Sequence, residues 1–305
     1  MASTLDEHLR QRALDTYHIV DTLPDAAYDD IARLASVLCD APIALVSLID
    51  RDRQWWKARF GVDGTGSPRE HAVCDHAIRT PGELFEVPDL SLDRRFADNP
   101  FVTGDTRAMF YAGMPLVTPG GAAVGTVCVL DQAPRQLSPQ QREALASLAR
   151  LTMNLMESTR REREHEIVSA IAPPPPSVEA DVAVCLIELQ NHAALVEFHG
   201  DRAVERMLNE LDSLIGAGLG EGDSINRVTH HPELVVALHG AGIEGAVTRI
   251  GSLVEQFAAQ HELVLLVGHA RNESPSESPT AIYLRADQML SAAKDRMVAD
   301  GGHDA

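Results

Sequence analysis

The chain has few aromatic residues, few cysteines and no long hydrophobic run. Phe, Trp and Tyr make up 4% of its 305 residues, and its four cysteines are Cys39, Cys74, Cys128 and Cys185. No Cys-x-x-Cys pair and no Cys/His spacing typical of zinc occurs. The longest apolar runs, such as residues 41–49, are well short of the ~20 residues that a membrane helix needs. The N-terminus lacks the apolar segment of a secretory signal, so we expect a cytoplasmic protein with no membrane partner.

Basic residues are also scarce. The chain has 26 Lys and Arg against 45 Asp and Glu, which gives a net charge of −19. Because nucleic-acid binding depends on a basic surface, this composition argues against a nucleic-acid partner. The acidity is greater in the second half, where an anionic nucleotide would need a local cation or metal.

The length and one proline run predict two domains joined by a helix. Four consecutive prolines at 173–176 cannot continue a helix or a sheet, so we assign 172–177 to a linker. A connecting helix is predicted over 138–171, apolar at its start and charged in its later part. That charged part is expected either to leave its domain and pair with a partner's copy or to end a simple amphipathic helix. The predicted domains cover 1–158 and 178–300.

The first half has an α+β pattern. A helix is predicted over 25–38 from the spacing of its apolar residues. Strand-like runs follow, and with intervening helices they favour an antiparallel sheet with helices on one face; these runs cover 42–50, 54–59, 108–117 and 123–130. In the second half strands and helices alternate, which predicts an α/β layer with a central sheet.

A series of motifs in the first half identifies a family. In order along the chain they are YHIVDTLP (17–24), YDDI (28–31), PIALVSLID (42–50), RQWWK (53–57), CDHAI (74–78), DRRF (93–96), NPFV (99–102), FYAG (110–113) and GTVCVLD (125–131). This series resembles the GAF domain found in front of bacterial signalling output domains, from about residue 10 to 158. The resemblance implies a sheet and a loop that enclose a small-molecule pocket, and it leaves the ligand unknown. Candidates for the ligand-binding residues of this pocket are Trp55, Cys74, His76, Phe96, Phe101, Phe110 and Tyr111.

Cys74 and His76 form the most reactive-looking pair. The alternatives are a redox-sensing thiol whose pKa His76 lowers, a thioether-linked chromophore, a metal-ligand pair, or ordinary scaffold of the pocket or core. Cys-x-His alone cannot complete a four-ligand metal site, and we find no third group, so scaffold is favoured. Cys39, Cys128 and Cys185 lie in apolar runs and are expected to be buried thiols.

The second half is similar to the GGDEF domain, the fold of diguanylate cyclases. The similarity covers Leu186–Leu208, Asn226-Arg227 with the strand after it, Leu265–Ala270 and Arg285–Met297. Within the last segment Ala286-Asp287 and Ala293-Lys294 match the AD and AK pairs of the family. The family joins two GTP molecules with the help of divalent metals. These metals are bound by an acid at the end of the first strand and by acids in a signature turn that contains glycines.

Here the residues for that chemistry are largely replaced. The strand-end acid is Glu188, a vestigial metal position, and Val196 and Glu205 occupy the guanine-reading positions. The signature turn contains Thr229, His230, His231, Pro232 and Glu233. Both glycines are lost, so β-carbons fill the space that a phosphate would need. The product-binding arginine is also missing, and adjacent histidines point apart, so we expect a solvated turn and no metal.

These features predict a non-catalytic signalling protein with no catalytic residue and no cofactor. The GAF domain would sense a small molecule or a partner, and the degenerate cyclase-like domain would serve docking or dimerisation. We expect a homodimer that acts on a downstream signalling protein. The alternatives are a thiol redox sensor through Cys74, and an active cyclase or a hydrolase that uses Glu188.

Overall fold

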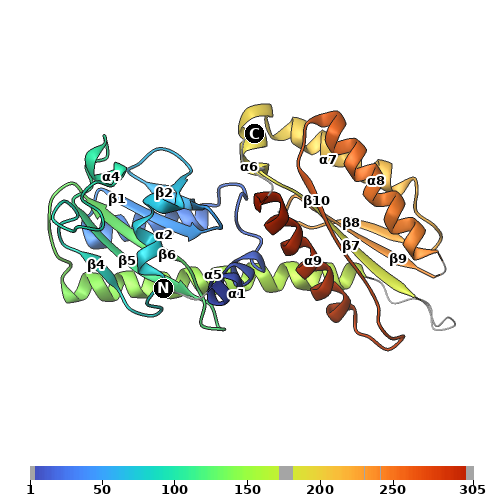
Figure 1. Ribbon diagram of the computed structural model, residues 1–305, viewed down its shortest axis with the longest axis horizontal. Helices are drawn as coiled ribbons and strands as arrows, with labels where there is room; N and C mark the ends of the chain where they lie inside the picture. The colour runs from blue at the N-terminus through green and yellow to red at the C-terminus, as the bar shows by residue number, and fades with distance from the viewer. Residues whose placement is uncertain (1–3, 172–180, 230, 241, 300–305) are drawn as a thin grey trace. The chain divides into compact units, whose positions relative to one another are not determined.

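The computed structural model describes residues 4–171, 181–229, 231–240 and 242–299 (Figure 1). The chain forms two compact units, Met1–Thr159 and Arg160–Ala305. The division lies inside one continuous helix, α5 (Pro139–Ala170), so this helix contributes residues to both units. No helix in the described ranges combines the length and the apolar character needed to cross a bilayer.

The first unit is built on one antiparallel sheet. Its six strands lie in the order β3-β2-β1-β6-β5-β4. Their bounds are β1 Ile43–Ile49, β2 Arg53–Phe60, β3 Gly66–Pro68, β4 Phe85–Val87, β5 Phe110–Val117 and β6 Ala123–Asp131. The helices are α1 Thr4–Asp15, α2 Ala26–Cys39, α3 Val73–Ala77, α4 Pro100–Thr103 and the first part of α5, with a short 3-10 helix η1 at Arg69–His71. The predicted α+β architecture is confirmed.

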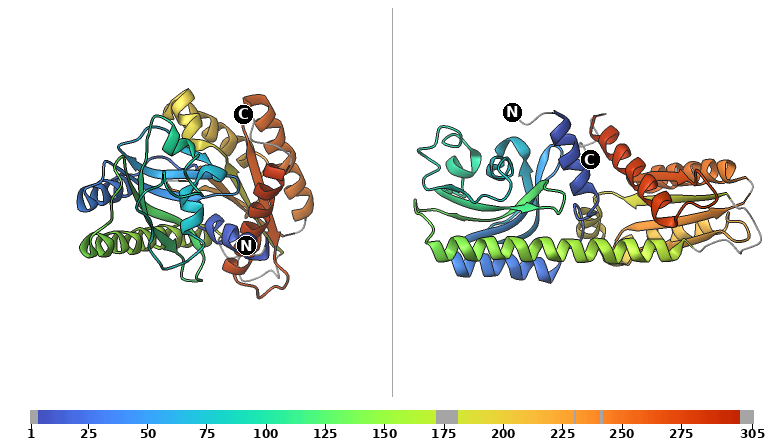
Figure 2. Two further views of the ribbon diagram at one scale, coloured as in Figure 1. Left: turned by 60° about the vertical axis from the view of Figure 1, so that its left-hand side comes forward. Right: turned by 90° about the horizontal axis from the view of Figure 1, so that it is seen from below.

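Both faces of this sheet are covered. On one face α1, α2 and α5 enclose a core that includes Trp55 and Phe110, and Figure 2 shows α2 and α5 together on that side. On the other face α3 and the connecting segments enclose a second core that includes Trp56 and Tyr111. We expected helices on one face only. The difference arises because α3 and α4 are too short to show a helical period in the sequence.

Helix α2 illustrates why these elements form where they do. The Asp25 side chain accepts a hydrogen bond from the Ala27 amide (2.9 Å) and caps the first turn. Ile31 and Ala35, one helical turn apart, are buried against the sheet. The helix ends at Cys39, and the next residue, Asp40, caps it with a left-handed backbone (φ 50°).

The second unit is an antiparallel sheet of four strands in the order β10-β7-β9-β8. The bounds are β7 Val182–Leu189, β8 Ser224–Arg227, β9 Glu233–His239 and β10 Leu265–Arg271, and the helices are α6 His192–His199, α7 Asp201–Gly216, α8 Ile243–His261 and α9 Pro279–Ala299. Helices α7 and α8 pack on one face. On the other face α9 packs together with Ile167 of α5 and with Ile171, which directly follows that helix. The sequence predicted this layering of a sheet and helices.

The charged end of α5 does not project from its unit. Ile167 and Ile171 are 0% and 2% exposed, and Arg163 is 2% exposed. We expected this segment either to leave its domain and pair with a second copy of the chain or to end a simple amphipathic helix. In the structure three residues at helical spacing form a narrow buried stripe within the charged sequence, so the segment buries one face in its own unit.

Candidate functional site

Cys74 lies in a closed cluster on the second face of the GAF-like sheet. It belongs to α3 and is 2% exposed. Its Sγ accepts hydrogen bonds from the Tyr111 hydroxyl on β5 and the Thr126 hydroxyl on β6, both at 3.2 Å. The Sγ of Cys128, also on β6, lies 3.7 Å away. Two cysteines that are 54 residues apart in the chain therefore meet beneath α3.

The environment makes Cys74 the more acidic of these two thiols. Burial alone would raise the pKa of Cys74, but hydrogen bonds from Cys128, Thr126 and Tyr111 together lower it to about 7. The hydrogen bond to Cys74 and burial raise the pKa of Cys128 well above its ordinary value. The sequence prediction that Cys39, Cys128 and Cys185 are buried thiols is confirmed. The proximity of Cys128 to Cys74 could not be seen in the sequence.

His76 packs against an aromatic cluster next to Cys74. Its ring meets Phe96 edge-on at a centroid distance of 4.8 Å. Phe85 in turn packs against Phe96 (6.4 Å) and Tyr111 (6.0 Å). Burial and the nearby Arg79 lower the pKa of His76 below its ordinary value. The causes that lower the pKa of Cys74 are its hydrogen bonds, and His76 is not among them.

The structure brings together most of the pocket residues predicted from the sequence. Cys74, His76, Phe96, Phe101 and Tyr111 lie on one face of the sheet. Trp55 and Phe110 lie in the core of the opposite face. Trp56, which packs near Phe101 at 6.2 Å, lies with the first group and was not among the candidates. The alternation of side chains along a strand predicts this separation, because neighbouring residues of one strand point to opposite faces of the sheet. Trp55 and Trp56 are such neighbours, and so are Phe110 and Tyr111.

In the second unit, α5 binds the last residue of the signature turn, Glu233. Arg163 of α5 and Glu233 are each 2% exposed, and their charged groups form a bidentate pair with N–O distances from 2.6 to 2.9 Å. The remaining Arg163 nitrogen, Nη1, donates to the Tyr283 hydroxyl (2.6 Å), and Asp287 lies 4.0 Å from Nη2. Although burial opposes it, the Glu233 carboxylate raises the pKa of Arg163 above its ordinary value.

The other end of the turn is held by the same helix. Glu166 of α5 accepts hydrogen bonds from the Thr229 amide (2.9 Å) and the Thr229 hydroxyl (2.6 Å). Pro232 is buried, and its carbonyl accepts from the Leu189 amide at 3.0 Å. His231 is half-buried, and His230 lies outside the described residues. The turn is thus fastened to the protein at both its ends.

Glu188, which we interpreted from the sequence as a vestigial metal position, forms an ion pair. The Glu188 carboxylate lies 2.7 Å from Lys294 Nζ, and each side chain is 13% exposed. Gln190 also donates to Glu188 at 2.9 Å. Glu205, at a predicted guanine-reading position, pairs with Arg227 at 3.1 Å. Across the described residues, no three His, Cys, Asp or Glu side chains are grouped as metal ligands.

Several solved structures share similarity with parts of the chain. The GAF domain of an Acinetobacter phosphoenolpyruvate-protein phosphotransferase is 14% identical, with a TM-score of 0.39, over 52% of this chain and 96% of that structure. Free methionine-R-sulfoxide reductase from Neisseria meningitidis is 17% identical, with a TM-score of 0.38, over 53% of this chain and 95% of that structure. A microbial GGDEF domain studied with cyclic di-GMP is 19% identical, with a TM-score of 0.36, over 46% of this chain and 86% of that structure.

A curated relative and a family model give a firmer result. A cyclic di-GMP phosphodiesterase of Pseudomonas aeruginosa is 40% identical over 156 residues, which is 51% of this chain. The chain spans only about a quarter of that relative, 26% of its length. The family model of the GAF domain matches residues 24–155. This range contains both cysteines of the buried cluster and all six strands of the first sheet, so the first unit of the chain contains a GAF domain.

Proposed function

We propose that the chain is a non-catalytic signalling protein. The GAF domain responds to a small molecule or a partner, and the second unit is a degenerate diguanylate cyclase-like domain that serves as a docking or dimerisation output. The observation that carries this proposal is the burial of Glu233. This acid of the signature turn is 2% exposed and paired with Arg163 of the connecting helix.

The chemistry of phosphoryl transfer supports the same proposal. A metal-assisted reaction needs carboxylates that are open to the ions and to the triphosphate. Here Glu233 is neutralised by Arg163, and Glu188 is neutralised by Lys294. A cation at either position would have to displace a buried or partly buried ammonium or guanidinium group, which costs desolvation and the existing ion pair.

Helix α5 connects the cores of the two units and could transmit a signal to the signature turn. One helix contributes Leu145 and Met156 to the core of the first unit, and Arg163 and Ile167 to the second. A change in the GAF domain that rotates or shifts α5 would therefore act directly on the turn that begins at Thr229. We propose that the second unit receives the signal through Arg163 and Glu166.

The proposed pathway is cyclic di-GMP signalling. The name of the Pseudomonas relative supports this, because its matched region is 40% identical over 156 residues. That region is about a quarter of the relative, so its phosphodiesterase activity does not follow for this chain. We place the ligand of the GAF domain beside His76 and Phe101, which are the less buried members of the Cys74 face.

The proposal is tested by assaying the purified full chain with GTP and Mg²⁺ and with cyclic di-GMP. We expect neither synthesis nor hydrolysis above a heat-denatured sample, while an active diguanylate cyclase and an active phosphodiesterase confirm that the assays work. Turnover by the chain, removed by Glu188→Ala, would refute the proposal.

A thiol sensor is the second candidate function. The 3.7 Å separation of the Cys74 and Cys128 sulfurs favours it, because a peroxide could oxidise the two thiols to a disulfide while it is reduced to water. Burial opposes it, since the two residues are 2% and 0% exposed. We favour the first proposal and expect both thiols to resist alkylation until the protein unfolds. Rapid alkylation of native protein, lost in Cys74→Ser but kept in Cys39→Ser, would support the sensor instead.

A further inference from the structure

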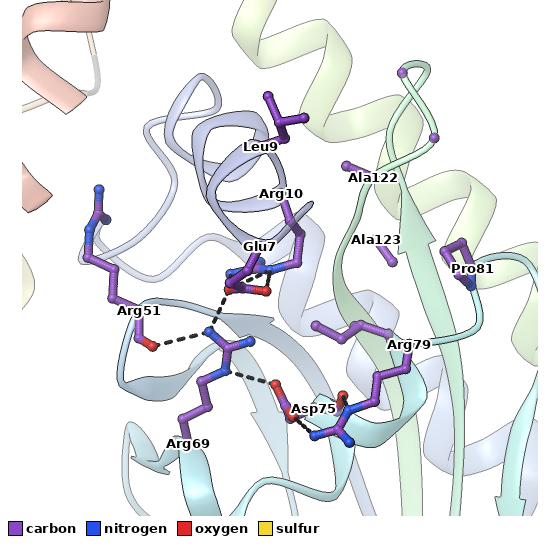
Figure 3. Close-up of a pocket in the computed structure, with 13 residues that line it drawn as sticks. Glu7, Leu9, Arg10, Arg51, Arg69, Asp75, Arg79, Pro81, Ala122 and Ala123 are labelled. Atoms are coloured by element: carbon purple, nitrogen blue, oxygen red, sulfur yellow. Dashed lines mark hydrogen bonds and ion pairs between the residues drawn. The ribbon is translucent and has the colours of Figure 1, made fainter. Parts of the chain in front are cut away.

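A cavity opens on the first unit beside α1 (Figure 3). Its volume is about 710 Å³, within the range that accommodates small organic molecules. Residues from α1, the β1–β2 turn, the segment from η1 to residue 81 and the β5–β6 turn line it. None of the aromatic residues predicted for the GAF pocket lines it, so this cavity is distinct from the Cys74 cluster.

The wall of the cavity has more positive than negative charge. Arg10, Arg69 and Arg79 are held by only two carboxylates, those of Glu7 and Asp75. The fourth lining arginine, Arg51, is matched by two acids that do not line the cavity, Asp15 and Asp50. The lining itself therefore carries four arginines against two carboxylates, and the two acids behind Arg51 bring the local total to four of each.

The two arginines that share Asp75 also have unused donors. Arg69 bonds through Nε to Asp75 (2.8 Å) and through Nη1 to Glu7 (2.7 Å). Arg79 bonds through Nε and Nη2 to Asp75, the latter at 2.6 Å. Within the described part of the chain, Arg69 Nη2 and Arg79 Nη1 have no hydrogen-bond partner. Each of these nitrogens carries two N–H groups.

The other side of the cavity is apolar. Leu9 is 56% exposed. Figure 3 shows Leu9, Ala122 and Ala123 across the cavity from Arg69 and Asp75. A ligand that fills the cavity would therefore meet cationic donors at one end and hydrocarbon at the other.

We propose that this cavity binds a small organic anion. Its carboxylate or phosphate group lies between Arg69 and Arg79, where it takes up the unused N–H donors. Its apolar part packs against Leu9 and Ala122. The inference is independent of the function proposed for the second unit.

The test is a titration of the full chain with benzoate, phenyl phosphate and the neutral benzamide, monitored by calorimetry and by ¹H–¹³C NMR of leucine and alanine methyl groups. We expect saturable binding of at least one of the two anions, with benzamide at least about tenfold weaker, because a charge-assisted bidentate contact is lost. The two anions tell a carboxylate site from a phosphate site. Signals of Leu9 and Ala122 should shift.

The variant Arg79→Gln supplies the decisive comparison, since its side chain is 59% exposed and can change without loss of the fold. It should weaken binding of the anion at least about tenfold. The matched control is Arg150→Gln, an equally exposed arginine (63%) on α5 that pairs with Glu143. Equal binding of benzamide, unchanged affinity in Arg79→Gln, or no saturable binding of either anion would overturn the inference.

Discussion

Arg163 and Glu233 are charged groups that have been removed from water almost completely. Such a pair is tolerated only when the two charges meet in good geometry and their remaining polar atoms are satisfied. Both conditions hold, because the contact is bidentate and Tyr283 accepts a further hydrogen bond from Arg163. The pair therefore fixes α5 to the start of β9 and makes the position of the signature turn depend on α5.

Replacement of Arg163 by methionine should destabilise the second unit strongly. It leaves the Glu233 carboxylate buried without a partner, which costs about 3–5 kcal/mol in the free energy of unfolding. Urea unfolding, followed by a probe in the second unit, measures the loss. The control Arg227→Met breaks the more exposed pair with Glu205 and should cost at most about 1 kcal/mol. Equal losses in the two variants would contradict the role assigned to Arg163.

Glu7 should make the first unit sensitive to acid. Burial alone would raise the pKa of Glu7, but hydrogen bonds from Arg10 and Arg69 lower it from 4.5 to about 2. Because the unfolded chain binds the proton more readily, this stabilisation is present above pH 4.5 and is lost as the pH falls towards 2.

The variant Glu7→Gln should therefore be less stable than the unmodified protein at neutral pH and should lose less stability on acidification. Unfolding midpoints in urea across this pH range measure the difference. Glu83→Gln, which changes an exposed carboxyl on the same unit, is the control. If acid weakens Glu7→Gln as much as the unmodified protein, the ion pairs of Glu7 do not carry this stability.

At the scale of elements, regular patterns predicted long segments well. The helix expected over 25–38 is observed at Ala26–Cys39, and the connecting helix expected over 138–171 is observed at Pro139–Ala170. The strand expected over 42–50 is observed at Ile43–Ile49. In these elements the spacing of apolar residues along the sequence follows from burial of one face or of both faces, and this spacing makes them predictable. Elements of three to five residues, such as β4 and α3, have too few residues for a period and were missed.

Contacts between distant elements could not be predicted. Arg163 lies in a run of charged residues, and its partner is 70 positions away, so the sequence favoured a solvated side chain. Cys128 was expected in the core, but only the placement of α3 over β6 reveals that its sulfur lies beside that of Cys74. The pocket candidates were partly separable, since adjacent strand residues such as Phe110 and Tyr111 must face opposite cores.

The packing of α9 on β10 depends on one glycine. A Cβ at Gly268 would lie 2.3 Å from the Ala286 carbonyl oxygen and 2.5 Å from the Leu290 amide nitrogen. Both are backbone atoms, so in Gly268→Ala the helix must move away from the strand, at a cost of about 1–3 kcal/mol. Urea unfolding measures this cost.

The matched substitution for this test is Gly251→Ala on α8, where a Cβ meets nothing within 4 Å. Since alanine favours a helix, this variant should be as stable as the unmodified protein or more stable. An unaltered stability of Gly268→Ala would show that α9 does not need this close approach.

At the scale of the whole molecule, an exposed apolar surface on the first unit suits the homodimer that we expect from the sequence. Leu34, Val37 and Leu38 of α2 are 48%, 68% and 47% exposed, and Leu151 of α5 is 57% exposed. The two helices are neighbours, as the hydrogen bond from the Gln141 side chain to the Cys39 carbonyl shows (2.9 Å). A second copy of the chain would cover this surface.

Light scattering at micromolar concentration should therefore give the mass of a dimer. Val37→Asp places a charge in the middle of the surface and should yield monomers, because burial of an unpaired carboxylate is unfavourable. Leu214→Asp, at an apolar residue of the second unit that is 41% exposed, should remain dimeric. A monomeric mass for the unmodified chain would rule out this assembly.

In the function proposed above, the signature turn is bound to the connecting helix through Thr229 and through its acid, Glu233, and does not bind GTP. This proposal is the central one. It is tested most directly by calorimetric titration of the full chain with GTP in the presence of Mg²⁺. We predict no saturable binding below the millimolar range, and the same result for Glu188→Ala. Tight binding of GTP that Glu188→Ala or a substitution of Thr229 or Glu233 abolishes would contradict the claim.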